Sequence, residues 1–387
     1  MKVLLCDPFG YSEDYNLPLF SALKDTGLDI EYLTSENTFL PRELEGAVPG
    51  RSYFFLRRSK AWLRLRLLPP ALVKSFGALE YFFDLGRLYR KAVREGAVVH
   101  LLWIKHPAID FFYGVLYGRL GRFVYTMHNA LPHDGETFVN KLSYALYYRL
   151  PHQIIALGQP EIDKALELDR GLAKRMNHIP HGLLFQKVPE REKASARAEL
   201  AWRRDEKIVL FWGNILPYKG IDDLLTAFSR LRDPGFTLAV AGKWSLPAAV
   251  KEQWLREARA DGRVALFEGF LEASRVRDLL CAADLLILPY KQATQSGVGF
   301  AALRYGLPLL VTRTGSLPEL LPEDFRGRWV VPPSSPDRLA AAIAAFFTQS
   351  ADERAAAGTK LRSYAAARFS WDDIARRTLE VYRRLDG

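Results

Sequence analysis

The feature that most constrains this chain is a regular alternation of short apolar runs with amphipathic stretches, from one end to the other. Short apolar runs between polar or Gly residues indicate strands that are buried on both faces of a sheet. The stretches between them repeat apolar residues at helical spacing. This alternation predicts parallel sheets covered by helices on both faces. We expect strands at 3–6, 30–33, 98–103, 123–127, 153–157, 208–212, 237–241, 264–267, 285–288 and 309–311. We expect helices at 17–27 and 138–150, and helices that begin near Asp222, Pro247, Ser274, Gly297 and Pro336.

The length of 387 residues indicates two domains, because a single hydrophobic core stops growing near ~250–300 residues. Residues 187–207 are charged and Ala-rich and include Pro189, which suits a linker followed by the first helix of a second domain. The sequence therefore predicts an α/β protein with two tandem, Rossmann-like, doubly wound domains. Ligands of such sheets bind at the carboxyl ends of the strands, so the substrate is expected in a cleft between the two domains.

Cysteine usage and the first residues bear on location. The two cysteines, Cys6 and Cys281, are far apart in sequence, so no disulfide framework is indicated and a reducing compartment is expected. The apolar run 3–6 is too short for a signal peptide. No stretch approaches the ~18 apolar residues that a membrane-spanning helix needs. We therefore expect a cytoplasmic protein, soluble or peripheral at the inner face of the cell membrane.

The net charge of +10 suggests an anionic partner. Residues 51–94 contain eleven Lys or Arg residues and only two acids, Glu80 and Asp84, with aromatic residues and leucines between them. Cations mixed with aromatic rings suit an anionic membrane surface, where the rings enter the headgroup boundary. One alternative is an amphipathic helix pair with a solvated basic face. Stacking on single-stranded RNA is a second alternative, although no RNA-binding signature accompanies it.

Two segments between a strand and a helix have the composition of phosphate-binding loops. In the first, Gly213 permits a tight turn, Asn214 follows it, and Lys219 provides a positive charge beside a helix N-terminus. An ordinary strand-to-helix loop with a solvated lysine is the structural alternative. The second segment runs through Thr294, Gln295, Ser296, Gly297 and Val298 to Gly299. Its small residues let backbone amides approach an anion, and Ser296 alternatively caps its own helix.

The order of several motifs resembles the family 4 glycosyltransferases of bacterial polysaccharide biosynthesis. The resemblance covers nearly all of the chain and implies the GT-B fold. It divides the chain into an N-terminal acceptor-binding domain at 1–186, a nucleotide-sugar-binding domain at 187–368, and a last helix at 369–387 that crosses back to the first domain. The motifs are Gly-x-x-x-Pro-Tyr-Lys-Gly at 213–220, Val-Ala-Gly at 240–242, Phe-Glu-Gly-Phe at 267–270, Ala-Asp-Leu-Leu-Ile-Leu-Pro at 283–289, Tyr-Gly-Leu-Pro at 305–308, Thr-Gly-Ser-Leu-Pro-Glu at 314–319, Thr-Met-His-Asn-Ala-Leu-Pro-His at 126–133, Ile-Pro-His-Gly at 179–182 and Phe-Ser-Trp at 369–371.

The resemblance also implies roles for individual residues in a retaining hexosyl transfer from a UDP- or GDP-sugar. Lys219 matches the lysine that neutralises the donor diphosphate, and Gly213 matches the glycine beneath it. The loop of Ser296, Gly297 and Val298 matches the amides that bind the distal phosphate. His128 matches a residue next to the donor sugar. Gly242 and Phe270 lie where the nucleotide base is held.

Three departures separate this chain from the family pattern. Asn214 and Leu216 stand where members carry an arginine, so one cation is missing. Ala293 and Ala301 stand where the family has a pair of glutamates. Retention and inversion both stay open for this reason: a retaining transfer lets the leaving phosphate take the acceptor proton, whereas an inverting one needs a base from the first domain. The candidate bases are Asp14, His128, Asp134 and Glu136, and Asn129 is expected beside them on the acceptor side.

The acceptor follows from the basic, aromatic first domain. We expect a membrane-presented glycan, linked to a polyprenyl diphosphate, in exopolysaccharide assembly. No Asp-x-Asp motif and no His/Cys cluster occurs, so neither a catalytic metal nor another cofactor is expected. Two alternatives from other classes are a non-catalytic GT-B protein that binds nucleotide or glycan, and a basic nucleic-acid-binding protein. Neither accounts for two phosphate loops at matching places, so no nucleic acid is expected as a partner.

Overall fold

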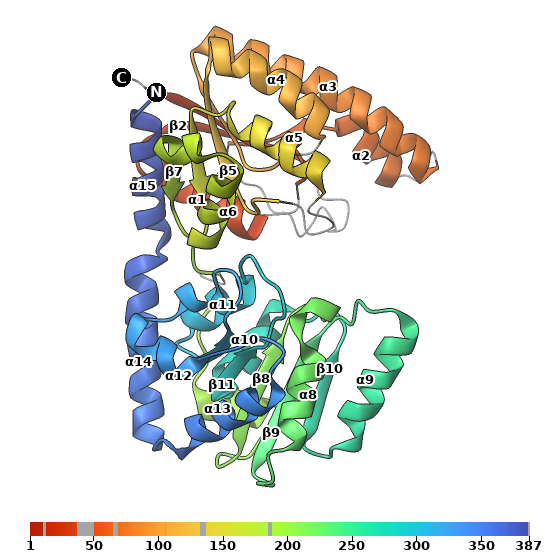
Figure 1. The fold of residues 1–387 in the computed structure, drawn as a ribbon, viewed down its shortest axis with the longest axis vertical. Coiled ribbons are helices and arrows are strands. Elements are labelled where there is room, and N and C mark those ends of the chain that lie inside the picture. The colour runs from red at the N-terminus through yellow and green to blue at the C-terminus, as the bar shows by residue number, and fades with distance from the viewer. Residues whose placement is uncertain are drawn as a thin grey trace. The chain divides into compact units, whose positions relative to one another are not determined.

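The structure is a computed structural model that describes residues 1–10, 13–36, 50–64, 69–104, 106–131, 137–184 and 188–385. The chain forms two compact units (Figure 1). Unit 1 comprises Met1–Gly182 and Trp371–Gly387, and unit 2 comprises Leu183–Ser370. The chain thus passes into unit 2 after Gly182 and returns to unit 1 at Trp371, where the last helix begins.

Unit 1 is a parallel sheet of seven strands in the order β3-β2-β1-β4-β5-β6-β7. Its strands are β1 (Lys2–Asp7), β2 (Asp29–Ser35), β3 (Arg51–Phe55), β4 (Val98–Leu101), β5 (Arg122–Met127), β6 (Gln153–Ala156) and β7 (Met176–His178). Its helices are α1 (Glu13–Asp25), α2 (Arg57–Arg64), α3 (Pro70–Glu95), α4 (Pro107–Leu120), α5 (Phe138–Tyr148), α6 (Gln159–Leu168), the 3₁₀ helix η2 (Arg170–Arg175) and α15 (Trp371–Arg383).

Alternate side chains of the unit 1 strands enter two separate cores, as the period of two of a strand requires. On β1, Val3 and Leu5 face one core, which α1 and α15 complete. Leu4 and Cys6 face the other core, which is completed by α3, α4, α5 and α6. Helices therefore cover both faces of the sheet, and Cys6 is a buried core residue.

Unit 2 repeats the scheme with six parallel strands in the order β10-β9-β8-β11-β12-β13. The strands are β8 (Lys207–Trp212), β9 (Phe236–Gly242), β10 (Val264–Glu268), β11 (Leu285–Leu288), β12 (Leu309–Thr312) and β13 (Val330–Val331). The helices are α7 (Lys193–Glu199), α8 (Ile221–Ser229), α9 (Ala248–Ala260), α10 (Ala273–Ala282), α11 (Gly297–Arg304), α12 (Glu323–Trp329), α13 (Pro336–Thr348) and α14 (Ala351–Arg368), with the 3₁₀ helices η3 (Pro217–Lys219) and η4 (Leu317–Leu320).

Both sheets have the strand order of a doubly wound, Rossmann-like domain, which confirms the predicted fold class. In each sheet the order reverses between the first strand and the fourth, which are β1 and β4 in unit 1 and β8 and β11 in unit 2. Ligands of such sheets bind at the carboxyl ends of the strands beside this reversal. The loops after β8 and β11, which carry the two predicted phosphate-binding segments, lie at this place in unit 2.

The structure corrects three features of the predicted strand pattern. The strands β3, β7 and β13 were not predicted, because each is short or carries polar residues. Residues 51–94, predicted as one membrane-facing segment, instead begin with β3 and send Phe55 and Tyr81 into the core. The predicted strand at 98–103 ends at Leu101, which leaves Trp103 in the loop that follows β4.

Candidate functional site

Three residues of the two predicted phosphate-binding loops lie close together in unit 2. Gly213 follows β8 with φ = 126°, and its N–H donates to the carbonyl of Ala241. A Cβ atom at Gly213 would lie 3.1 Å from Cγ2 of Val298 and 3.2 Å from Nζ of Lys219. The glycine therefore leaves room for both neighbours, and the structure brings Gly213, Lys219 and Val298 together at the carboxyl edge of the sheet.

Lys219 is a buried cation at the end of η3. Its Nζ lies 5.3 Å from the ring centre of Tyr290, a cation–π contact. The ammonium group makes no hydrogen bond and no ion pair with the described residues. Burial lowers the pKa of Lys219 to about 8, which corresponds to roughly 3 kcal/mol against the charged form. A lysine held in this way is suited to an anion that arrives with the ligand.

The N-terminus of α11 supplies unpaired amides beside this lysine. Ser296 caps the helix by accepting a hydrogen bond from the N–H of Gly299 at 3.4 Å, and its hydroxyl lies 3.2 Å from that of Tyr290. The amides of Gly297 and Val298 have no hydrogen-bond partner among the described residues. Ser296 thus has the capping role, and the same cap aims free N–H groups and the positive end of the helix dipole outward.

Backbone packing holds the loop after β9 against the first loop. Gly242 has φ = 137°, and a Cβ atom there would lie 1.9 Å from the carbonyl oxygen of Gly213. The Gly242 carbonyl accepts the N–H of Gly269 at 3.0 Å, which places the neighbouring Phe270, 88% exposed, beside the same edge. Any residue other than glycine at position 242 would push the two loops apart, so this part of the site is built from backbone atoms.

The remaining predicted residues of unit 2 stabilise the loops. Asn214 accepts a hydrogen bond from the hydroxyl of Ser245 at 2.7 Å. The carbonyl of Thr294 accepts the N–H of Ser316 at 2.9 Å. Gln295 is half-buried, and its Nε2 is a buried donor without a partner among the described residues. An unpaired buried amide of this kind costs about 1–3 kcal/mol, which a bound ligand with an acceptor atom would offset.

The two positions where the family pattern has glutamates differ in kind. Ala301 is fully buried in the core of unit 2, so a carboxylate there would require rearrangement of that core. Ala293 is half-buried, and its carbonyl lies next to Gly315, where a Cβ atom would lie 2.1 Å away. Lys291, a cation in the same loop as Ala293, pairs with Asp222 at 2.6 Å.

In unit 1, His128 follows β5 and stacks on the indole of Trp103, with ring centres 3.9 Å apart and planes 7° from parallel. Tyr15 also contacts the imidazole edge-on, with ring centres 5.2 Å apart. The Nε2 of His128 and the Nε1 of Trp103 are buried and have no partner among the described residues. Burial first, and then the neighbouring His181 and His100, lower the pKa of His128 to about 3. The imidazole is therefore neutral near pH 7 and is a weak base.

Of the other predicted acceptor-side residues, the structure describes Asp14 and Asn129. Asp14 lies in the first turn of α1 with an exposed side chain. Asn129 follows His128, and its carbonyl accepts the hydroxyl of Tyr148 at 3.3 Å. Asp134 and Glu136 lie outside the described residues. His181 packs against Tyr15 and Trp371, with ring centres 5.0 and 5.9 Å away.

Sequence reasoning missed two aromatic residues of the site, Trp103 and Tyr290. Each is the second residue beyond the carboxyl end of its strand, β4 or β11. That position alone is the signal that could have found them, because it is where a doubly wound sheet binds ligands. In the part of the chain that the structure describes, no His, Cys, Asp or Glu side chains form a group of three or more that could hold a metal ion.

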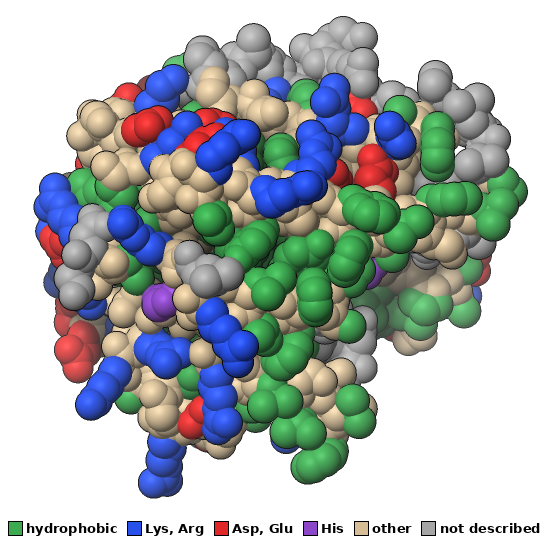
Figure 2. Space-filling model, turned by 90° about the horizontal axis from the view of Figure 1, so that it is seen from above, with side chains coloured by type: hydrophobic (Ala, Val, Ile, Leu, Met, Phe, Trp, Pro, Cys, Tyr) green, Lys and Arg blue, Asp and Glu red, His purple; other side chains and the backbone are tan. Residues whose placement is uncertain are grey.

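Unit 1 also carries an exposed apolar surface, the α3–α5 face. Eleven of the fourteen large hydrophobic side chains that are exposed among the described residues belong to α3, α4 and α5. These helices pack next to one another (Figure 1), and Phe82 of α3 stacks on Phe112 of α4. The space-filling view shows hydrophobic side chains gathered in a band with Lys and Arg beside it (Figure 2). The face comprises Leu72, Phe76, Leu79, Phe83, Val93, Phe111, Phe112, Phe138, Val139, Leu142 and Leu146.

Among the described residues, no helix combines the length and the apolar character that crossing a membrane requires. Contiguous exposed apolar side chains are typical of surfaces that bind another molecule or a membrane.

Comparison with known proteins identifies the class of the fold and of unit 2. Residues 206–349 match the family of glycosyl transferases group 1. The chain can be superposed over 99% of its length on all of HepE from Anabaena, in complex with UDP, with a TM-score of 0.78 and 18% identity. It covers 99% of sucrose-phosphate synthase from Thermosynechococcus elongatus, over its own full length, with a TM-score of 0.74 and 18% identity. The fold is therefore GT-B, and the match to the glycosyl transferases group 1 family lies within unit 2.

Relatives in sequence belong to the same class. A D-inositol 3-phosphate glycosyltransferase from Segniliparus rotundus is 30% identical over 215 residues, which are 54% of this chain and 47% of that protein. An uncharacterized glycosyltransferase, MJ1607, from Methanocaldococcus jannaschii is 26% identical over 201 residues, 50% of this chain and 48% of that protein. The chain thus spans about half the length of the relatives it matches.

Proposed function

We propose that this chain is a glycosyltransferase that moves a hexosyl group from a nucleoside diphosphate sugar to a lipid-linked glycan at a membrane surface, in polysaccharide biosynthesis. One observation carries the proposal. Lys219 is a buried cation without an anionic partner among the described residues, next to Gly213 and the free amides at the start of α11. This arrangement suits a diphosphate, because it combines a positive charge with preorganised N–H donors.

The transfer step breaks the bond between the sugar C1 and the β-phosphate oxygen and forms a bond from C1 to an acceptor hydroxyl oxygen. Negative charge then develops on the β-phosphate, where Lys219 and the amides of Gly297 and Val298 would stabilise it. The acceptor proton must move to a base. His128, with a pKa of about 3, is a weak base near pH 7. This favours a retaining transfer in which an oxygen of the leaving diphosphate takes the proton, with the neutral His128 as a hydrogen-bonding group at the donor sugar.

The donor base is the second element of the proposal. HepE, which shares the fold, has been crystallised with UDP and with UDP-glucose. We therefore favour a UDP-sugar over a GDP-sugar. A thermal-shift panel with UDP, GDP, ADP, CMP and dTDP tests this choice, because a ligand at ~100 times its Kd adds about 2.7 kcal/mol to the stability of the folded state.

The variant Lys219→Gln makes the panel specific to the diphosphate site. Loss of one charge-assisted interaction of about 1.5–3 kcal/mol should raise the Kd for UDP by roughly 10- to 100-fold. Lys251→Gln on α9, which removes a lysine elsewhere in unit 2, is the matched control and should leave the Kd unchanged. The proposal fails if no nucleotide raises the melting point of the wild-type chain, and that result would favour a GT-B protein without transferase activity.

The α3–α5 face supports the proposed membrane surface. Full burial of one large apolar side chain contributes about 1.5–3 kcal/mol, so insertion of only a few side chains of this face is enough for reversible binding. Exposed cations such as Arg90 and Arg119 lie on the same helices and would meet anionic headgroups. Vesicle flotation tests the idea: the chain should float with vesicles that contain phosphatidylglycerol and less with neutral vesicles. Failure to float with either kind of vesicle would show that the proposed membrane binding is wrong, and it would not affect the proposal for the donor site.

A further inference from the structure

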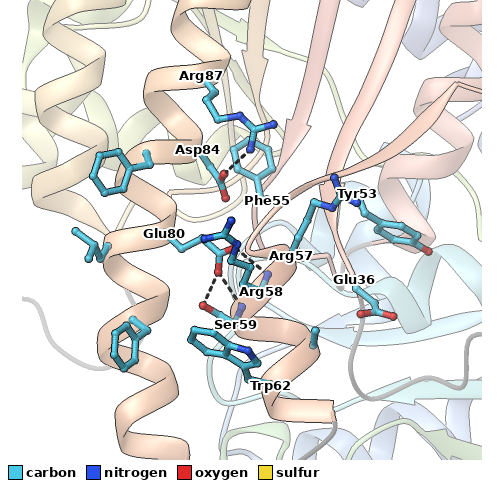
Figure 3. Close-up of a pocket in the computed structure, with 14 residues that line it drawn as sticks. Glu36, Tyr53, Phe55, Arg57, Arg58, Ser59, Trp62, Glu80, Asp84 and Arg87 are labelled. Atoms are coloured by element: carbon cyan, nitrogen blue, oxygen red, sulfur yellow. Dashed lines mark hydrogen bonds and ion pairs between the residues drawn. The ribbon is translucent and has the colours of Figure 1, made fainter. Parts of the chain in front are cut away.

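Unit 1 contains a pocket that the proposed donor and transfer sites do not use. It has a volume of about 890 Å³ and lies between α2, α3 and the end of β3 (Figure 3). Apolar residues of α3 form one wall. Trp62 of α2 closes one end of the pocket, where its ring lies edge-on to that of Phe76 with centres 5.6 Å apart. Phe55, at the carboxyl end of β3, also lines the pocket.

Two carboxylates of α3 hold the pocket open. Asp84 accepts the N–H of Leu56 at 2.8 Å, and Leu56 has φ = 56°, so the chain turns sharply where β3 ends. Glu80 accepts the N–H of Arg58 and both the N–H and the hydroxyl of Ser59, at 2.6–2.8 Å, and so caps the start of α2. These contacts fasten α2 to α3 at one end. Glu80 accepts three hydrogen bonds, and Asp84 accepts two when the contact from Arg87 is included, out of about four that each carboxylate can accept.

Three guanidinium groups border the pocket beside these carboxylates. Arg57 and Arg58 have exposed side chains that make no hydrogen bond or ion pair with any described residue. Arg87 lies over the ring of Phe54 at 5.1 Å and contacts Asp84 at 3.3 Å. Figure 3 shows the three arginines around the upper part of the pocket, with Trp62 at its lower end. Glu36 also lines the pocket, so the three guanidinium groups share the lining with three carboxylates, of which Glu80 and Asp84 already accept the hydrogen bonds described above. Trp62 provides aromatic surface at the other end.

The apolar wall of the pocket is continuous with the α3–α5 face. Phe76, Leu79 and Phe83 line the pocket, and they are also 47%, 55% and 60% exposed. An amphiphile in a membrane that covered this face could therefore move its chain along the wall without crossing water. The pocket also begins where β3 ends, at the same edge of the sheet as His128 after β5. The order β3-β2-β1-β4-β5 separates these ends by four strand spacings, about 19 Å.

We propose that this pocket binds the lipid anchor of the acceptor, a polyprenyl-type phosphate or diphosphate, with its phosphate on Arg57, Arg58 and Arg87 and its first apolar units against Trp62, Phe76 and Phe83. The identification as acceptor anchor rests on the proposed function. A bulk phospholipid shares the charge and the apolar chain, but the pocket opens at the edge of the sheet where His128 lies. The glycan of the acceptor would then span the distance from the pocket to His128.

Calorimetric titration of the intact chain with farnesyl diphosphate, below its micelle concentration and without vesicles, tests this directly. We expect saturable binding that is at least tenfold tighter than that of farnesol, inorganic pyrophosphate or dihexanoyl phosphatidylglycerol. Equal binding of pyrophosphate would mean that the pocket binds a free phosphate compound and not a lipid. Equal binding of the phosphatidylglycerol would mean that the pocket binds bulk membrane lipid and not the acceptor anchor. Either result overturns the proposal.

Variants locate the binding. The double variant Arg57→Gln/Arg58→Gln should bind farnesyl diphosphate at least tenfold more weakly than the wild type. The single variant Trp62→Ala should show a loss of affinity of the same size. The matched pair Arg90→Gln/Arg94→Gln, which removes two exposed cations of α3 outside the pocket, should have no effect, and an equal loss in that pair would overturn the proposal. The UDP-induced rise in melting point serves as the fold control for every variant. Because the titration involves neither vesicles nor transfer, its failure would leave the donor-site proposal standing.

Discussion

The two units have the same strand order, yet their helices present different surfaces. In unit 1, α3, α4 and α5 expose eleven large hydrophobic side chains. In the described part of unit 2 the large exposed hydrophobics are Tyr218, in η3, and Phe270, in the loop after β10, both beside the proposed donor site. Burial of a core therefore does not explain the apolar residues of the α3–α5 face, since unit 2 closes an equivalent sheet without such a face. The difference indicates that the surface of unit 1 is specialised for a partner and that unit 2 is specialised in its loops.

The largest effect is expected on membrane binding when apolar residues are removed from the α3–α5 face. The variant Phe138→Glu/Leu142→Glu on α5 should reduce partitioning to anionic vesicles by at least about 100-fold, because two side chains of about 1.5–3 kcal/mol each no longer insert. The unit 2 variant Tyr218→Glu/Phe270→Glu adds the same charge to exposed aromatic residues and should float like the wild type. Equal loss in both variants would mean that charge alone decides membrane binding and that the two surfaces do not differ.

A second comparison concerns the loops of unit 2, which depend on backbone contact. Gly242→Ala should lower the free energy of unfolding by about 3–5 kcal/mol, since the left-handed backbone costs about 1–2 kcal/mol and the contact with the Gly213 carbonyl adds to it. Gly269 has φ = 103°, and a Cβ atom there would have no atom within 4 Å. Gly269→Ala should therefore lower the free energy of unfolding only by the cost of the left-handed backbone. Gly262→Ala, in open space, should be close to neutral. Urea unfolding followed by circular dichroism measures all three, and equal losses at 242 and 269 would contradict the packing argument.

The pH dependence of nucleotide binding sharpens the role of Lys219. The pKa of Lys219 is lowered to about 8 in the free protein, and a bound diphosphate, which favours the charged form, must raise it. Affinity for UDP should therefore be constant below pH 8 and fall about tenfold per pH unit above it, until the pKa of the bound state is reached. Titration calorimetry between pH 6.5 and pH 9.5 checks this, with Lys219→Gln as the reference. A wild-type profile as flat as that of the variant would exclude Lys219 as the titrating contact.

The smallest expected effect separates capping from ligand binding at Ser296. Ser296→Ala and Ser350→Ala each remove a helix cap, of α11 and of α14, and each should lower the free energy of unfolding by about 1 kcal/mol. UDP affinity should fall several-fold in Ser296→Ala only, because the cap at α11 also orients the amides of Gly297 and Val298. Unchanged UDP affinity in both variants would show that Ser296 has a capping role and nothing more.

Much of the fold could be predicted because periodicity is a local property. Buried parallel strands must be apolar throughout, and the runs at 285–288 and 208–212 match β11 and β8 to within one residue. The strands that were missed, β3, β7 and β13, are short or polar and depend on neighbouring strands for their hydrogen bonds. Their pairing partners are distant in sequence, so no local pattern identifies them.

The sequence by itself determined the alternating α/β architecture, the two loops with Lys219 and Ser296, and the concentration of cations and aromatic residues at 51–94. Only the tertiary structure decided which of those aromatic residues are core and which are exposed, since Phe55 and Tyr81 are buried while Phe76 and Phe83 are 47% and 60% exposed. It also decided that Gly213, Lys219 and Val298 meet, and that Trp103 stacks on His128. The physical reason is that charge and hydrophobicity are properties of residues, whereas burial and the pKa values that follow from it depend on neighbours brought from distant parts of the chain.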